Sequence, residues 1–307
     1  MDCFTVAAQF KQTLHLTMKK TLSILALFLT AVAPLGAKTS VWKVQSGDHV
    51  VYVGGTIHLL RESDYPLPKE FDEAFARSTE LWLETDLGAM ATPEAQQLMD
   101  AEGVYRDGRT LEQAIGPKAW AEVRNYCGSI GISPAQIAQL KPWYFVINIA
   151  AIELQKLGVT PNGVDAHFYA MAQPAGKSVQ GLETFEQQVH YLATMGAGHE
   201  SEMIMQSLEE LGDMQDSFKA MLAAWRAGDL EKLDEDMLAE MREKYPAIYQ
   251  SIILERNQAW LKAIDGMLQT EPVEYVLVGV AHLAGDKGLI RALQQKGYQV
   301  TQLNAAN

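Results

Sequence analysis

The chain has 307 residues, of which 48% are hydrophobic and 21% are charged, and its formal net charge at pH 7 is −13. This composition is typical of globular proteins. No run of lysines and arginines provides the basic surface that binding to nucleic-acid phosphates requires, so we exclude a nucleic-acid partner.

The start of the chain has the pattern of a secretory signal peptide. The basic segment Met18-Lys19-Lys20 precedes an apolar stretch over 21–33, and the small residue Ala37 marks a cleavage point. The apolar stretch is shorter than the roughly 20 residues that cross a bilayer. We therefore expect Met18 to be the initiator and residues 1–37 to be a leader, removed on export to the periplasm or the medium. No stable membrane span would then remain, and an uncleaved anchor is the alternative.

The first predicted elements are two strands, over 41–44 and 49–54, joined by the turn Ser46-Gly47-Asp48. A helix is expected over 69–79, followed by a strand over 80–86 that ends in carboxylates. Residues 92–157 have a helical pattern, in which one helix begins at Ser133-Pro134 and continues to Gly158.

The second half begins with a helix at Gly163 and a strand over 177–183, which also ends in an acid. A long helical region covers 184–268, and the chain closes with a strand (274–279), a helix (287–296) and a strand (298–303). Strands thus lie near both ends and helices fill the middle. We predict a single α/β domain over 38–307, in which helices flank a central mixed sheet. Helical insertions are expected at about 92–157 and 184–268.

One short motif occurs twice. Val51–Leu59 and Val276–Leu283 are both apolar runs that end in Gly-x-x-His-Leu, and they place His58 and His282 just after predicted strands. Ligands of α/β sheets bind where the carboxyl ends of strands meet, so we expect both histidines in one site. Gly55 and Gly279, three residues before the histidines, would allow a sharp turn or the close approach of a ligand.

Carboxylates follow two other predicted strands, at Glu84 and Glu183. Two imidazoles and one or two carboxylates suit a divalent metal with an open position, which activates water and polarises a carbonyl. The same residues can also work without metal, with a histidine or a glutamate as general base. Each acid can alternatively cap the helix that follows its strand.

Two further polar residues have a structural and a functional interpretation. Asp165 either caps a helix or orients an imidazole. Arg256 lies within a predicted helix, where an arginine is usually solvated or ion-paired, but it can also bind a carboxylate or stabilise an oxyanion.

In combination, these residues resemble the TraB/GumN family, which includes the Tiki proteins. The resembling segments span roughly 41–304 in the family's order: Trp42-Lys-Val, Gly54–Leu59, Leu83–Asp86, Gly163–Asp165, Gly181–Thr184 with Gln187/Gln188, Arg256-Asn257 and Val278–Gly285. The resemblance implies a fold similar to the erythromycin esterase/ChaN group and an active site with paired Gly-x-x-His motifs and an essential glutamate. It also implies metal-dependent peptidase activity with Mn²⁺ or Co²⁺, as in Tiki-type members.

By position, His58 and His282 match the family's paired histidines and Glu84 its acid, while Arg256 and Asn257 match a late polar pair. Ala281 stands where the resemblance predicts a glycine, which would tighten the approach to His282.

We therefore predict an exported metal-dependent hydrolase, a peptidase acting on a peptide or a small molecule. His58, Glu84 and His282 would bind Mn²⁺ or Co²⁺, with Zn²⁺ and Fe²⁺ as alternatives, and Arg256 would steady the substrate or the oxyanion. Asp165, Glu183 and Asn257 would support them. Two alternatives stay open: a metal-independent, esterase-like hydrolase with histidine as general base, and an iron- or haem-binding or interaction protein without catalysis.

Overall fold

The computed structural model describes residues 38–304, which all belong to one compact unit. The predicted leader, with its start at Met18 and its cleavage point at Ala37, lies outside the described residues.

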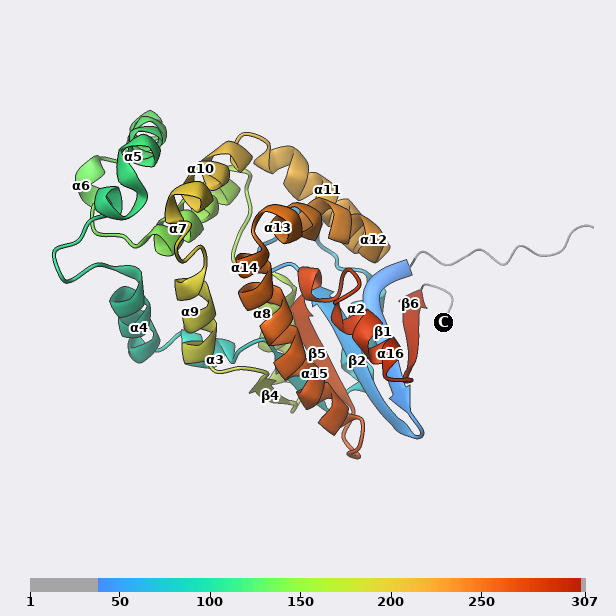
Figure 1. Cartoon of the computed structure of the whole chain (residues 1–307). Coiled ribbons are helices and arrows are strands. Elements are labelled where there is room, and N and C mark those ends of the chain that lie inside the picture. The colour runs from blue at the N-terminus through green and yellow to red at the C-terminus, as the bar shows by residue number, and fades with distance from the viewer. Residues whose placement is uncertain (1–37, 305–307) are drawn as a thin grey trace, which may run out of the picture. The chain divides into compact units, whose positions relative to one another are not determined.

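A mixed six-stranded sheet forms the centre of the described chain (Figure 1). Its order is β4-β3-β5-β2-β1-β6, and β4, β3, β5 and β2 run parallel, whereas β1 is antiparallel to both β2 and β6. The prediction of an α/β fold with a mixed sheet is thereby confirmed. The strands are β1 (Lys38–Ser46), β2 (His49–Thr56), β3 (Glu80–Leu83), β4 (Ser178–Gly181), β5 (Glu274–Gly279) and β6 (Gln299–Asn304).

The predicted hairpin at the start is present. Ser46 pairs with His49 across the turn, and Gly47 has a φ of +59°, a conformation that residues with a side chain rarely adopt. The turn fixes the register that brings the end of β2 to the centre of the sheet.

Alternate residues of β5 face opposite layers of helices. Tyr275 and Leu277 pack against α2 (Lys69–Arg77), α8 (Val164–Ala172) and α11 (Met214–Ala227), whereas Val276 and Val278 pack against α15 (Arg256–Met267) and α16 (Leu289–Gln295). Buried on both faces, β5 reads as an unbroken apolar run, as parallel strands between helical layers do.

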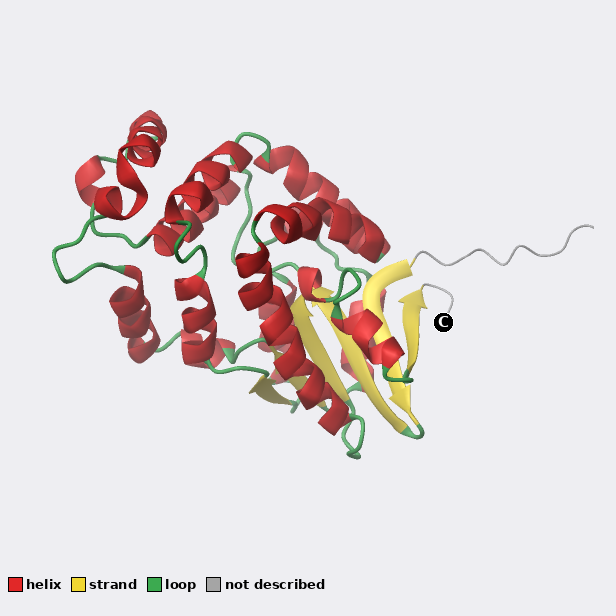
Figure 2. Cartoon of the chain, in the orientation of Figure 1, coloured by secondary structure: helices red, strands yellow, loops and turns green. Residues whose placement is uncertain are grey.

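The middle of the chain is helical, and Figure 2 shows these helices gathered beside the sheet. Part of this region has a core of its own, formed by α5, α6, α7 and α10. The helices not yet given bounds are α3 (Leu87–Met90), α4 (Pro93–Gly103), α5 (Leu111–Ser129), α6 (Pro134–Ile137), α7 (Pro142–Lys156), α9 (Phe185–Thr194), α10 (Glu200–Glu210), α12 (Leu230–Leu233), α13 (Ala239–Lys244) and α14 (Pro246–Tyr249).

Several predicted boundaries differ from those in the structure, and two of the differences have a clear physical reason. The helix expected from Pro134 to Gly158 is interrupted after Ile137, and α7 begins anew at Pro142, because a proline starts a helix readily but does not continue one. The strand expected to reach Asp86 ends at Leu83, where the chain turns so that Asp86 accepts a hydrogen bond from the backbone N–H of Gly88 and caps α3.

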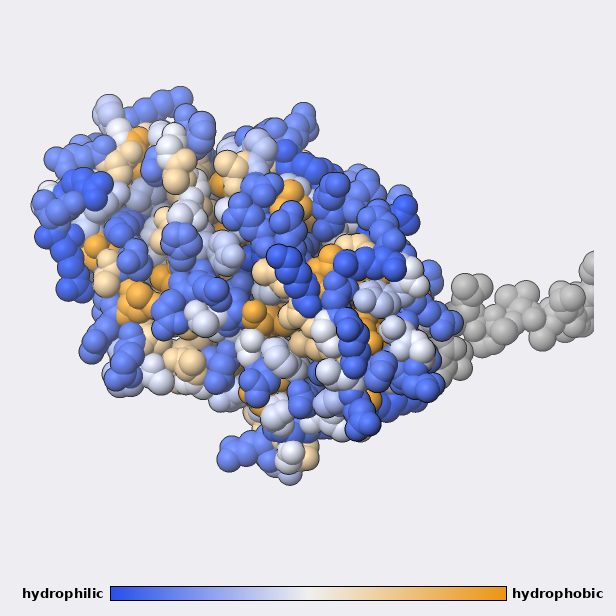
Figure 3. Space-filling model, turned by 60° about the horizontal axis from the view of Figure 1, so that its bottom comes forward, coloured by the Kyte–Doolittle hydropathy of each residue, from blue (hydrophilic) through white to orange (hydrophobic). Residues whose placement is uncertain are grey.

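Within residues 38–304, no helix combines the length and the apolar composition that crossing a bilayer demands. On the face seen in Figure 3, hydrophobic residues form small separate groups within a mostly hydrophilic surface.

Candidate active site

The ends of β2, β3 and β5 bring three of the predicted residues to one edge of the sheet. Thr56 pairs with Gly279 in the parallel register and Leu83 pairs with Leu277, so the residues that follow these strands converge. They converge on Gly279: a Cβ atom placed there would lie 3.1 Å from Oε1 of Glu84, 3.5 Å from Nε2 of His58 and 3.6 Å from Cδ2 of His282. The glycine therefore keeps a space open between the three side chains.

His58 is held by Asp165, the second residue of α8. The ion pair between Nδ1 of His58 and Oδ2 of Asp165 measures 3.2 Å, and 52% of the His58 side chain is exposed. Burial alone would lower the pKa of His58, but the hydrogen bond and the charge of Asp165, together with the charge of Glu84, raise it to about 9. Because half of the imidazole meets solvent, screening weakens the energetic consequence of that shift.

Gly163 explains how α8 comes close enough for this contact. A Cβ atom on Gly163 would lie only 2.2 Å from the backbone carbonyl of His58, so any side chain would push the helix away. The backbone N–H of Val164 also donates to the carbonyl of Ile57. The Gly163-Val-Asp165 segment thus places Asp165 against the imidazole, which is the orienting role among its two predicted interpretations.

Glu84 is buried and ionised. Its Oε1 accepts a 2.6 Å hydrogen bond from the backbone N–H of Gly279, and its Oε2 accepts a 2.5 Å hydrogen bond from Arg256. Burial alone would raise the pKa of Glu84, but the positive charge of Arg256 and the neighbouring His58 lower it to about 2. Oε1 also faces Nε2 of His58 at 3.7 Å, a distance that leaves the pair without a direct hydrogen bond.

Arg256 lies at the centre of the polar cluster with only 8% of its side chain exposed. It donates to both oxygens of Glu183, at 3.1 and 2.7 Å, in addition to Glu84. Its guanidinium lies 4.5 Å from the ring centroid of Trp260. Of the predicted interpretations of this arginine, the structure shows the ion-paired one, with two carboxylates of the protein itself.

The two glutamates that share Arg256 titrate differently. Burial raises the pKa of Glu183 above its ordinary value despite the attraction of Arg256, and the charge of Glu84 adds to the rise, whereas the pKa of Glu84 is lowered. Two neighbouring carboxyl groups whose pKa values are pushed apart are typical of sites in which one group stays ionised.

A π-helical segment, η3 (Gln250–Glu255), runs directly into α15 at Arg256. Such wide turns change the direction in which the following side chains point, and they are frequent at functional sites. Arg256 and Asn257, the first residues after this turn, are both buried and both contact the cluster.

His282 differs from His58 although the two motifs look alike. Nδ1 of His282 lies 2.8 Å from Oδ1 of Asn257, and Nε2 lies 3.1 Å from a guanidinium nitrogen of Arg256. Asn257 uses its amide N–H groups on the carbonyls of His282 and Lys287, so its oxygen must accept a hydrogen bond from Nδ1–H. Nε2 is then left to accept from Arg256. Burial, with the charge of Arg256 contributing, lowers the pKa of His282 to about 3, so this histidine is neutral and positions the arginine.

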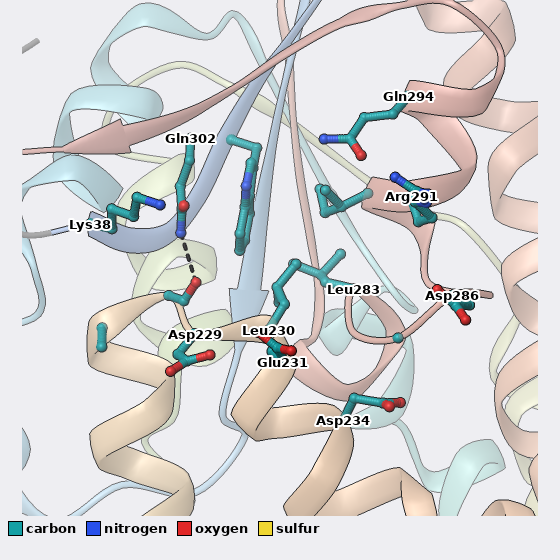
Figure 4. Close-up of a pocket in the computed structure, with 15 residues that line it drawn as sticks. Lys38, Asp229, Leu230, Glu231, Asp234, Leu283, Asp286, Arg291, Gln294 and Gln302 are labelled. Carbon is teal, nitrogen blue, oxygen red and sulfur yellow. Dashed lines mark hydrogen bonds between the residues drawn. The ribbon is translucent and has the colours of Figure 1, made fainter.

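The cluster forms the polar end of a cavity of about 330 Å³, which is lined by His58, Glu84, Asp165 and Arg256 together with mainly apolar side chains. A larger hollow of about 790 Å³ lies elsewhere, against the loop after His282. In Figure 4, Lys38 and Arg291 stand on opposite sides of that hollow, above Asp229 and Asp234. This hollow contains no histidine, and its Asp234 is already paired with Arg242.

The remaining predicted residue, Gly55, faces away from the cavity. A side chain there would meet Val280 and Leu283, so this glycine makes room for the His282 loop. Trp260 was missed by the sequence interpretation although it packs on both Arg256 and His282. Its position four residues after Arg256 on the same helix is the signal that could have identified it.

We expect Gly279→Ala to reduce activity by about 10²-fold, because the added methyl group would crowd Glu84 and fill the space beside His58. Steady-state kinetics and thermal unfolding measure the effect. Gly266→Ala, in open space within α15, is the matched control and should leave activity unchanged while adding about 0.5–1 kcal/mol of stability. Equal activities of the two variants would show that the open space beside Gly279 is not required for activity.

Comparison with known proteins adds three findings. The uncharacterized protein YbaP of Escherichia coli strain K12 is 23% identical over 250 residues, which is 81% of this chain and 89% of YbaP, and YbaP of Shigella flexneri matches to the same extent. No solved structure matches the chain. The TraB/PrgY/gumN family profile matches residues 40–302, which include every residue of the polar cluster. The chain therefore belongs to the TraB/PrgY/gumN family.

Proposed function

We propose that the protein is a hydrolase of acyl bonds, in esters or amides, and that His58 is its general base. One observation carries the proposal: an accessible imidazole, held by Asp165 on Nδ1, faces the buried carboxylate of Glu84 across 3.7 Å at the end of a cavity. A base oriented by a carboxylate and open to substrate on its other nitrogen is the arrangement that activates water.

The contacts assign a step to each of these groups. Asp165 accepts the hydrogen bond of Nδ1–H and keeps Nε2 free as the base. Nε2 takes a proton from a water molecule that lies beside Nε2 and Glu84, in the space that Gly279 leaves open, while the water oxygen attacks the acyl carbon. The same nitrogen then gives the proton to the leaving alcohol or amine as the acyl bond breaks, so no further acid is required.

Arg256 supplies positive charge where negative charge develops. A guanidinium has five N–H groups, and the bonds to Glu84, Glu183 and His282 use four of them. Because Arg256 also lines the cavity, the remaining N–H can donate to the oxygen of the tetrahedral intermediate. Glu183 and His282 then act by holding the guanidinium in place.

The divalent metal implied by the family resemblance does not fit the residues as they are arranged. Both ring nitrogens of His282 face Asn257 and Arg256, and Oε2 of Glu84 is bonded to the guanidinium. Among residues 38–304, no three His, Cys, Asp or Glu side chains are grouped to hold one ion. A second cation beside Arg256 would also be repelled. We derive no step through a metal, and a site at His58, Glu84 and His282 stays a prediction that metal analysis can check.

Export to the periplasm or the medium remains part of this proposal. It is supported by the basic, apolar and small-residue pattern of residues 18–37.

The pH dependence of activity tests the role of the Asp165–His58 pair. Since the base must be neutral, kcat/KM should rise with pH, with an apparent pKa above 6.5 and up to about 9. In Asp165→Asn the carboxylate that stabilises the protonated imidazole is gone. The rise should therefore move to lower pH, and the plateau should fall by about 10²-fold or more. Hydrolysis of 4-nitrophenyl acetate from pH 5 to 10 measures both effects, and identical profiles would refute the role of His58 as base.

A further inference from the structure

The cavity in front of the polar cluster has two unlike ends. His58, Glu84, Asp165 and Arg256 form one end, and no other titratable group except Tyr191 lines it. Most of the remaining wall is contributed by aliphatic and thioether side chains from β3, α3, α9, η3 and β5: Leu83, Leu87, Met90, Leu192, Ile252 and Leu277. A group bound against these side chains is therefore surrounded mainly by apolar atoms.

Met90 indicates that this apolar lining reaches the surface. In the described part of the chain, Met90 and Met171 are the large hydrophobic residues that are exposed, with 40% and 37% of their surface accessible. Met90 lines the cavity from α3, whereas Met171 on α8 is not part of its wall. An apolar ligand bound in the cavity would contact this methionine and cover part of it.

Three polar side chains, those of Thr85, Gln188 and Tyr191, interrupt the apolar wall. Gln188 and Tyr191, one helical turn apart on α9, both line the cavity, and the structure gives neither the Gln188 amide nor the Tyr191 hydroxyl a hydrogen-bond partner. An amide and a hydroxyl beside an apolar pocket provide donors and acceptors for a ligand that carries an amide of its own.

We propose that this cavity is an acyl-side pocket that selects substrates whose acyl group carries an apolar side chain of about leucine size, next to an amide that Gln188 and Tyr191 recognise. The substrate class is thus an N-acylated amino acid or peptide with an apolar residue on the acyl side of the scissile bond. This inference rests on the proposed hydrolase function of the same site.

The direct test compares the 4-nitrophenyl esters of N-acetylglycine, N-acetylalanine and N-acetylleucine. Full burial of the leucine side chain predicts that kcat/KM increases from glycine to leucine by roughly 10- to 150-fold. Equal values for the glycine and leucine esters would overturn the inference. Hydrolysis of all three at equal rates would leave the hydrolase function itself intact.

Substitutions at the cavity mouth should change this preference selectively. Met90→Glu places a charge in the apolar lining and should reduce the leucine-to-glycine ratio of kcat/KM by roughly tenfold. Met171→Glu is the matched control, because it charges the other exposed methionine outside the cavity, and the ratio should not change. Equal effects of both variants would contradict the assignment.

A second comparison tests recognition of the amide. Gln188→Leu should slow hydrolysis of the N-acetylleucine ester more than that of 4-nitrophenyl 4-methylpentanoate, which has the same side chain and lacks the amide. A uniform effect on both esters would refute the amide contact.

Binding separates this inference from the hydrolase proposal. If no ester is hydrolysed, the hydrolase proposal fails, and calorimetry with N-acetylleucinamide and N-acetylglycinamide still tests the pocket. Tighter binding of the leucine compound by roughly tenfold or more supports it, and equal or no binding of both overturns it.

Discussion

His58→Gln is expected to reduce hydrolysis of 4-nitrophenyl esters by about 10²- to 10⁴-fold, the usual contribution of a positioned general base. Glutamine can donate a hydrogen bond to Asp165, but it cannot take a proton from water. Because 52% of the His58 side chain is exposed, the variant should fold and unfold much like the parent protein. Steady-state kinetics and a thermal unfolding curve on the same samples measure the two effects.

The control for this variant lies at the other end of the same strand. His49 begins β2 at the hairpin, at the end of the strand opposite to the polar cluster. His49→Gln should therefore retain full activity. If His58→Gln were as active as His49→Gln, His58 would be excluded as the base.

Arg256→Met is expected to destabilise the protein by about 3–5 kcal/mol, because it leaves two buried carboxylates without their cation. The matched control is Arg242→Met, which breaks the pair with Asp234 where the arginine side chain is 42% exposed, and it should cost less than about 1 kcal/mol. Denaturant unfolding of both variants measures these differences. Similar losses of stability in both variants would show that burial does not make the Arg256 ion pairs more important for stability than the exposed Arg242 pair.

The difference in stability between Arg256→Met and the parent protein should depend on pH. In the parent protein the pKa of Glu84 is lowered from its ordinary value of 4.5 to about 2. The ionised Glu84 therefore stabilises the fold fully above pH 4.5, and this contribution is lost as the pH falls towards 2. Without Arg256, we expect burial to raise the pKa of both glutamates in the folded state. The variant should then be closest to the parent in stability at low pH and fall further behind as the pH rises. A difference that does not vary with pH would contradict the pairing.

The sequence was sufficient to predict which strand ends meet. The apolar runs before His58, Glu84 and His282 identified β2, β3 and β5, and the rule that polar groups gather at the carboxyl ends of parallel strands placed the three side chains together. The sequence alone does not decide whether Asp165 caps a helix or orients an imidazole. The close contact between Gly163 and the His58 backbone decides it, because this contact places Asp165 against the His58 ring.

The difference between the two histidines could not be predicted. Their motifs are nearly the same, and the difference arises from long-range neighbours: Asp165 contacts one imidazole, whereas Asn257 and Arg256 contact the other. The direction of Arg256 depends on the π-helical turn before it, for which the residues of η3 carry no distinct signal. The interruption before Pro142 was overlooked because the hydrophobic spacing continues across it.

Metal analysis combined with an activity assay decides whether His58 acts as the base without a metal. The purified protein is dialysed against a chelator, its metal content is determined by mass spectrometry, and its hydrolysis of 4-nitrophenyl acetate is compared with that of His58→Gln. We expect the metal-free protein to keep its activity and the variant to lose it. An inactive metal-free protein whose activity returns only with stoichiometric Mn²⁺ or Co²⁺ would exclude the metal-independent mechanism and place a metal at the paired histidines.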